Sequence, residues 1–190
     1  ADNSLNQFVS HPFHQELKIN DTFSVTFQPV GHILGAASVH IKACGKSIAF
    51  TGDVGRLNDV IMKPPENLPK ADYLVIESTY GDRLHPETDE FSELADIVNS
   101  TIANKGVVLI PAFAVGRAQA LMFMLSELIH QRRIPKVPIY LNSPMATNAS
   151  DLLCKYKDIH KLSEQECNET CGVVKYIRTV EESKSLNEQK

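Results

Sequence analysis

Residues 47–56 read SIAFTGDVGR, an apolar segment followed by a turn with two glycines and one carboxylate. The apolar part predicts a strand, which the Gly-Asp pair ends. Before it, apolar and polar side chains alternate over residues 38–43, and a Cys-Gly-Lys turn separates the two segments. Residues 38–51 are therefore predicted to form a β-hairpin.

Apolar spacing along the rest of the chain predicts an α/β fold in two parts. The first part is rich in strands, with further strands expected at 24–29 and 73–76; the second of these is apolar throughout and is expected to be buried on both faces. After Gly81, helices and strands alternate, which predicts a Rossmann-like parallel sheet with helices on its faces. The expected helices span 91–102, 117–131 and 147–156, and the expected strands span 107–110 and 139–141. The boundary between the parts is expected near residues 82–86.

The composition is that of an ordinary globular protein. The chain has 190 residues, of which 43% are hydrophobic and 22% charged, with a formal net charge of −4. These values exclude a disordered, collagen-like or disulfide-scaffold chain. No apolar run reaches the length of a membrane span, and the first residues lack the pattern of a secretory signal, so a cytoplasmic location is expected. The charge balance by itself does not indicate nucleic-acid binding.

Four cysteines are present without a CxxC pair. We expect Cys44, Cys154, Cys167 and Cys171 to be reduced structural thiols. The alternative is a zinc knuckle in which Cys167 and Cys171 act with His160, although the spacing fits such a site poorly.

Three residues with metal-binding or acid–base chemistry follow strand ends, beside small residues. They are His32 in GHILGAAS, Asp53 in TGDVGR and Glu77 in ESTYGD. An α/β scaffold presents ligands at such strand ends, so a shared metal site is one interpretation. The other interpretation is local: a hydrogen-bonded loop histidine, a turn aspartate and a glutamate paired with an arginine.

These three segments and a fourth, PAFAVGRAQ at 111–119, occur in an order and spacing that resemble the β-CASP branch of the metallo-β-lactamase superfamily. The resemblance runs from about Pro12 to Asn187. It implies a partial metallo-β-lactamase αββα sandwich over residues 1–83, followed by the first part of a Rossmann-like β-CASP domain over residues 84–190. It also implies a zinc-dependent phosphodiesterase that cleaves RNA with a metal-held hydroxide.

The resemblance assigns roles to individual residues. His32 matches a metal ligand of the family, and Asp53 matches the aspartate that bridges two zinc ions. Glu77 matches an acid that supports a histidine thought to protonate the leaving group, so Asp53 and Glu77 are the expected catalytic residues. A carboxylate and a neutral imidazole suit zinc, and two such ions can generate a nucleophile at neutral pH.

Two residues of the second part are expected to contact RNA. Arg117 lies at the start of a helix, where the helix N-terminus and the guanidinium attract a phosphate; the alternative is an exposed arginine or one paired with a carboxylate. Ser143 lies in a similar strand-to-helix loop, where it either contacts the RNA backbone or caps the helix.

The family's HxHxDH motif and its two later histidines have no counterpart within these 190 residues. We therefore expect a fragment of a longer enzyme, inactive alone because its zinc site is incomplete, and with bare sheet edges that favour a homodimer. Two alternatives remain open: a non-catalytic paralogue that binds or scaffolds, and a hydrolase of small esters or amides. The sequence does not distinguish endonuclease from exonuclease action, or RNA from DNA as substrate.

Overall fold

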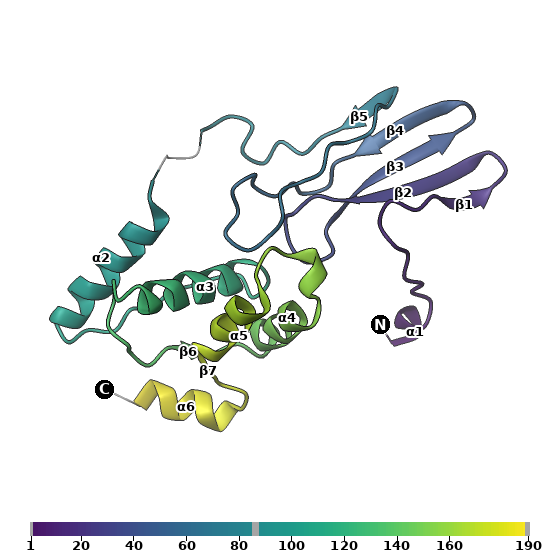
Figure 1. The fold of residues 1–190 in the computed structure, drawn as a ribbon. Coiled ribbons are helices and arrows are strands. Elements are labelled where there is room, and N and C mark those ends of the chain that lie inside the picture. Colours follow the sequence, from purple (N-terminus) through teal and green to yellow (C-terminus); the bar gives the residue numbers. More distant parts are fainter. Residues whose placement is uncertain (1, 85–87, 189–190) are drawn as a thin grey trace. The chain divides into compact units, whose positions relative to one another are not determined.

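The computed structural model describes residues 2–84 and 88–188, which form two compact units (Figure 1). The first unit comprises Ala1–Asn58 and Pro64–Asp82, and the second comprises Asp59–Lys63 and Arg83–Lys190. The predicted α/β class is confirmed. Residues 85 and 86 of the expected boundary lie outside the described residues. That residues 1–83 are a metallo-β-lactamase part and 84–190 a β-CASP part stays a prediction.

The first unit is a five-stranded sheet in the order β1-β2-β3-β4-β5. Its strands are β1 (Leu17–Asn20), β2 (Phe23–Pro29), β3 (Ala37–Ala43), β4 (Lys46–Phe50) and β5 (Tyr73–Val75), and a short helix α1 (Asp2–Leu5) precedes them. The first four strands pair antiparallel, and β5 pairs parallel to β4. The predicted hairpin is confirmed: its turn lies at Cys44 and Gly45, both with positive φ.

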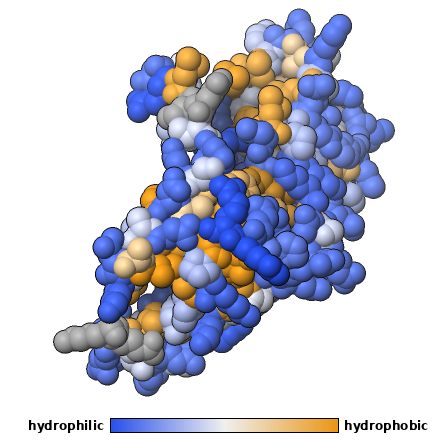
Figure 2. Space-filling view, turned by 60° about the vertical axis from the view of Figure 1, so that its left-hand side comes forward, coloured by the Kyte–Doolittle hydropathy of each residue, from blue (hydrophilic) through white to orange (hydrophobic). Residues whose placement is uncertain are grey.

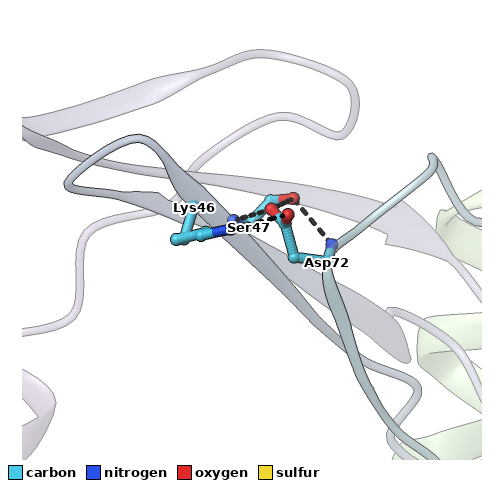
Figure 3. A network of polar contacts seen from close by, with 3 residues as sticks. All are labelled: Lys46, Ser47 and Asp72. Carbon is cyan, nitrogen blue, oxygen red and sulfur yellow. Dashed lines mark hydrogen bonds and ion pairs between the residues drawn. The ribbon is translucent and has the colours of Figure 1, made fainter.

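Asp72 joins the start of β5 to the start of β4 (Figure 3). One oxygen of its carboxylate accepts the backbone N–H of Ser47 at 2.8 Å and the Ser47 hydroxyl at 3.0 Å. Lys46 lies 3.5 Å from the other oxygen. These contacts fix the register at which β5 pairs with β4.

The prediction that residues 73–76 are buried on both faces is wrong. In β5 and just after it, Tyr73, Leu74 and Ile76 are each more than half exposed. Burial on both faces requires helices or loops packed on each face of the sheet, and among the described helices and strands only β4 makes extensive contact with β5.

The second unit is mainly helical. Its helices are α2 (Glu90–Ala103), α3 (Arg117–His130), α4 (Pro144–Lys155), α5 (Glu164–Gly172) and α6 (Val180–Glu188), with a 3-10 turn η1 (Lys157–Ile159). Strands β6 (Tyr140–Leu141) and β7 (Lys175–Tyr176) pair parallel. The three predicted helices are confirmed within a few residues at each end. Asp89 caps α2 by accepting the N–H groups of Phe91 and Ser92.

The core of the second unit forms where α2 packs on α3. Its buried side chains are Leu94, Ala95, Val98, Met124, Leu125, Leu128 and Ile134. On the other side of α3, α5 packs against both α3 and α4, where Leu153 and Cys167 are fully enclosed. None of the described helices combines the length and apolarity that crossing a bilayer requires.

The strand predicted at 107–110 does not form. Val107 and Leu109 are more than four-fifths exposed. The space-filling view shows that apolar side chains reach the surface of this protein among hydrophilic ones (Figure 2). A strand needs a hydrogen-bonding neighbour, and in the described part of the chain β6 pairs with β7 alone. The Rossmann-like sheet is therefore represented by two short parallel strands.

The expectation that all cysteines are reduced is also wrong. Cys154 and Cys171 form a disulfide, whereas Cys44 and Cys167 are free. The alternative knuckle with His160 does not form either, because one ring nitrogen lies 3.0 Å from the Leu153 carbonyl and the other accepts the Leu162 N–H. The packing of α4 against α5 brings together cysteines whose sequence spacing gives no disulfide signal.

Candidate functional site

Three loops at one edge of the first unit's sheet carry His32, Asp53 and Glu77. Because β3 is antiparallel to both β2 and β4, and β5 is parallel to β4, strands β2, β4 and β5 run in the same direction. Their carboxyl ends therefore meet at the same edge, and each of the three residues lies two or three positions beyond such an end.

His32 and Asp53 face each other at this edge. The His32 Nε2 atom lies 4.0 Å from the Asp53 Oδ2 atom, and the side chains are 46% and 76% exposed. Neither group is sequestered in the interior, so both can accept an external ligand. The structure brings this pair together although 21 residues separate them in the sequence.

A close backbone contact holds the two loops in this position. The Gly55 N–H donates to the Val30 carbonyl at 2.8 Å. A Cβ atom at position 55 would lie 2.0 Å from the Gly31 carbonyl oxygen, so only glycine fits there. Gly31 and Gly52 also have positive φ, of 64° and 60°, which glycine adopts without steric cost.

Glu77 is bound to the loop that carries Asp53. Its carboxylate accepts the Val54 N–H at 2.6 Å and the Thr79 hydroxyl at 2.9 Å. Its own N–H donates to the hydroxyl of Thr51, a buried residue at the end of β4. The Val54 N–H above all, then the Thr79 hydroxyl, and to a smaller degree the charge of His32 lower the pKa of Glu77. The carboxylate is therefore anionic at neutral pH.

The second unit places Arg117 and Ser143 at the N-terminal ends of α3 and α4. Arg117 is exposed, and its guanidinium makes no hydrogen bond or ion pair with any residue that the structure describes. The Ser143 hydroxyl accepts the Ala146 N–H at 3.2 Å and so caps α4. The capping interpretation of Ser143 is thus confirmed, and its hydroxyl hydrogen remains able to donate.

Gln119 links these two helix ends. Its side-chain oxygen accepts the Gly116 N–H at 2.8 Å, and its side-chain nitrogen lies 3.2 Å from the Ala146 carbonyl and 3.1 Å from the Ser150 hydroxyl. Only 4% of Gln119 is exposed. This buried amide therefore fixes the first turn of α3 against the first turn of α4.

Comparison with known proteins shows which proteins this chain resembles. The family model described as the Beta-Casp domain matches residues 118–190. Ribonuclease TTHA0252 from Thermus thermophilus is 40% identical over 124 residues, which are 65% of this chain and 28% of that protein. Endoribonuclease ysh1 from Schizosaccharomyces pombe is 36% identical over 149 residues, 76% of this chain and 19% of that protein. Cleavage and polyadenylation specificity factor subunit 3 from Dictyostelium discoideum is 37% identical over 148 residues, again 76% and 19%.

The chain belongs to the β-CASP metallo-β-lactamase family. It spans less than a third of the length of these three relatives. Ser143 and Gln119 lie inside the matched Beta-Casp segment, and Arg117 is the residue before it. The roles of His32, Asp53, Glu77, Arg117 and Ser143 stay predictions.

The donor set of this β-CASP chain suits a metal ion. His32 offers an imidazole nitrogen and Asp53 a carboxylate oxygen, both ligands of zinc with bonds of about 2.0–2.2 Å. Exposed side chains whose donor atoms lie 4.0 Å apart need only small rotations to share one ion. They supply two ligands, fewer than a closed zinc site requires.

Two residues that support the site were not identified from the sequence. The signal for Gln119 is an amide within the otherwise apolar face of the RAQALMFML helix. The signal for Thr51 is a hydroxyl residue immediately after an apolar strand, where a backbone N–H from the next strand needs an acceptor.

Proposed function

We propose that the parent of this chain is a metal-dependent nuclease that hydrolyses phosphodiester bonds in RNA, with zinc as the metal. The observation that carries the proposal is the pairing of His32 and Asp53, 4.0 Å apart at the carboxyl edge of the sheet. Two relatives of the chain are named as ribonucleases, and a third is named for cleavage and polyadenylation. The endoribonuclease name favours internal cleavage over exonuclease action.

In this proposal His32 and Asp53 would hold the metal through an imidazole nitrogen and a carboxylate oxygen. Metal held there would lower the pKa of a bound water molecule and supply positive charge beside the scissile phosphate. Glu77 is a positioning residue, since its carboxylate fixes the Val54 N–H next to Asp53 and so limits the motion of the Asp53 loop.

Arg117 and Ser143 are proposed to bind the RNA backbone. The free guanidinium can form paired hydrogen bonds with a phosphate, and the helix N-terminus behind it contributes partial positive charge. Ser143 can donate its hydroxyl hydrogen while it accepts the Ala146 N–H. Gln119 keeps these two helix ends in a fixed relation.

Kinetics of the full-length parent test the proposal. Asp53→Ala should lower the rate of RNA cleavage by several orders of magnitude, because it removes a metal ligand. Arg117→Ala should raise KM with little change in kcat and reduce the steepness of the salt dependence by about one unit, because it removes one phosphate contact. Unchanged cleavage by Asp53→Ala would show that Asp53 does not hold the catalytic metal, whereas no cleavage by the unchanged parent would favour the non-catalytic paralogue. A fall in kcat with KM unchanged would place Arg117 in the catalytic set.

The 190-residue chain alone is expected to be inactive on labelled single-stranded RNA with added Zn²⁺, because two ligands do not close a metal site. Cleavage by this chain that is lost in Asp53→Ala would show that a sufficient site exists within it and would contradict the fragment interpretation.

A further inference from the structure

Three of the four cysteines meet where α4 packs against α5. The sulfur atoms of Cys154, Cys167 and Cys171 all lie within 4.8 Å of one another. Cys154 belongs to α4, whereas Cys167 and Cys171 are four residues apart in α5 and so project from the same face of that helix. Cys167 is fully buried, and the other two are partly buried.

A disulfide accounts for only two of these sulfurs. Cys154 and Cys171 are bonded to each other, which leaves the free thiol of Cys167 beside them. The Cα atoms of the bonded pair are 7.3 Å apart. In most disulfides this separation is about 4.4–6.8 Å. The two helices therefore hold Cys154 and Cys171 at a spacing that also suits two ligands of one ion.

The distances fit a zinc–thiolate site. With Zn–S bonds of about 2.3 Å, sulfurs bound to one tetrahedral ion lie roughly 3.8 Å apart. The Cys167 sulfur lies within 4.8 Å of both of its neighbours, so side-chain rotation can bring it to that separation. Once the disulfide is reduced, the other two sulfurs can also separate by side-chain rotation. His160 is not a further ligand, because both of its ring nitrogens are engaged with backbone groups.

We propose that Cys154, Cys167 and Cys171, when reduced, bind one Zn²⁺ ion between α4 and α5. Three thiolates leave one coordination position, which a water molecule can fill. The ion ties the C-terminal end of α4 to α5 in place of the disulfide. The site lies in the second unit and does not depend on the proposed nuclease activity.

Zinc binding and the disulfide exclude each other, so the site is sensitive to redox conditions. A dithiol reductant transfers two electrons and two protons to the Cys154–Cys171 bond, giving two thiols while its own sulfurs form a disulfide. Binding of Zn²⁺ then forms three Zn–S bonds and releases three protons from the thiols. Oxidation of the chain before zinc is added should therefore prevent binding.

Zinc titration of the 190-residue chain tests the site. The chain is reduced with dithiothreitol, desalted under argon and titrated with Zn²⁺ against a chromophoric chelator. We expect one ion per chain, and an affinity at least about 100-fold lower in Cys167→Ser. Cys44→Ser is the matched control, because Cys44 is exposed and lies in the first unit; it should bind as the unchanged chain does. Equal binding by Cys167→Ser, or loss of binding in Cys44→Ser, overturns the proposal.

A second measurement needs no variant and so does not depend on how Cys167→Ser folds. The reduced chain is treated with iodoacetamide with and without Zn²⁺, and modification of each cysteine is quantified by mass spectrometry. Zinc should protect Cys154, Cys167 and Cys171 together and leave Cys44 as reactive as before. If zinc leaves Cys154 and Cys171 unprotected, these two thiols do not bind the ion and the proposal fails.

Discussion

Gly55 shows how a single position without a side chain holds the candidate site together. A methyl group there would lie 2.0 Å from the Gly31 carbonyl oxygen and 2.7 Å from the His32 backbone nitrogen, and neither backbone atom can move without displacing His32. Gly55→Ala should therefore lower the free energy of unfolding by about 3 kcal/mol or more. Urea unfolding of the 190-residue chain, followed by circular dichroism, measures this change.

The matched control is Gly172→Ala at the end of α5, where an added Cβ meets nothing within 4 Å. Alanine is the better helix former, so this substitution should leave stability unchanged or raise it by up to about 1 kcal/mol. Equal effects at positions 55 and 172 would contradict the close contact between the two loops.

Glu77 should make stability depend on pH. Its pKa is lowered in the folded chain, so the unfolded chain takes up a proton near pH 4.5, the usual value, before the folded chain does. The stabilisation is complete above that pH and is lost as the pH falls through the lowered pKa. Glu77→Gln should cost roughly 0.5–1 kcal/mol at pH 7, since the group is partly exposed, and the gap to the unchanged chain should close in acid.

The free energy of unfolding of the unchanged chain and of Glu77→Gln, measured between pH 7 and pH 3, gives the difference in stability at each pH. Thr79→Val removes one of the two donors to the carboxylate. In a chain that carries Thr79→Val, the loss of stability caused by Glu77→Gln at pH 7 should therefore be smaller, but not zero. A gap that keeps its size at every pH would show that these hydrogen bonds do not favour the charged form of Glu77.

At the scale of helices, the amide of Gln119 should determine how firmly α3 and α4 hold together. Gln119→Met keeps the volume of the side chain but leaves the Gly116 N–H without its acceptor and the Ala114 carbonyl without its side-chain donor. The Ala146 carbonyl still accepts the Ser150 hydroxyl at 2.9 Å. We expect a loss of about 2 kcal/mol in urea unfolding, because the Gly116 N–H and the Ala114 carbonyl are partly buried and lose their partner. Gln131→Met at the exposed C-terminal end of α3 should change stability by no more than about 0.5 kcal/mol. Equal losses at the two positions would mean that the link between the helices is unimportant.

The helices and the hairpin could be predicted because their signals are local. Apolar and polar side chains alternate within β3, and apolar side chains recur at helical spacing within α2 and within α3. Each signal lies within one segment, and the residues that cap or turn the chain lie directly beside that segment. The strand at 107–110 could not be judged in this way, because its apolar run does not reveal whether a neighbouring strand exists. The same holds for β5, whose exposure depends on its place in the strand order.

For the molecule as a whole, the sequence indicated the residues of the candidate site but not the contacts that hold them in position. Motif order indicated His32, Asp53 and Glu77, and the common direction of their strands brings the three loops to one sheet edge. The hydrogen bonds by which Gln119 links α3 to α4, and the Cys154–Cys171 disulfide, could not be found from the sequence. Each joins two helices whose contact depends on how the helices pack. Contacts of this kind have no fixed spacing along a chain.

One edge of β5 has no partner strand among the residues that the structure describes, which leads to a prediction about association of the 190-residue chain. An edge strand presents unpaired N–H and C=O groups that a second copy can pair with, and Tyr73, Leu74 and Val75 are 58%, 56% and 48% exposed. We expect a concentration-dependent dimer in analytical ultracentrifugation. Leu74→Lys should weaken it at least about tenfold, because a lysine on an edge strand opposes pairing. Leu57→Lys is the control, since Leu57 is 80% exposed and lies outside any strand. A chain that stays monomeric at every concentration, or a dimer weakened equally by both substitutions, would show that β5 is not the contact.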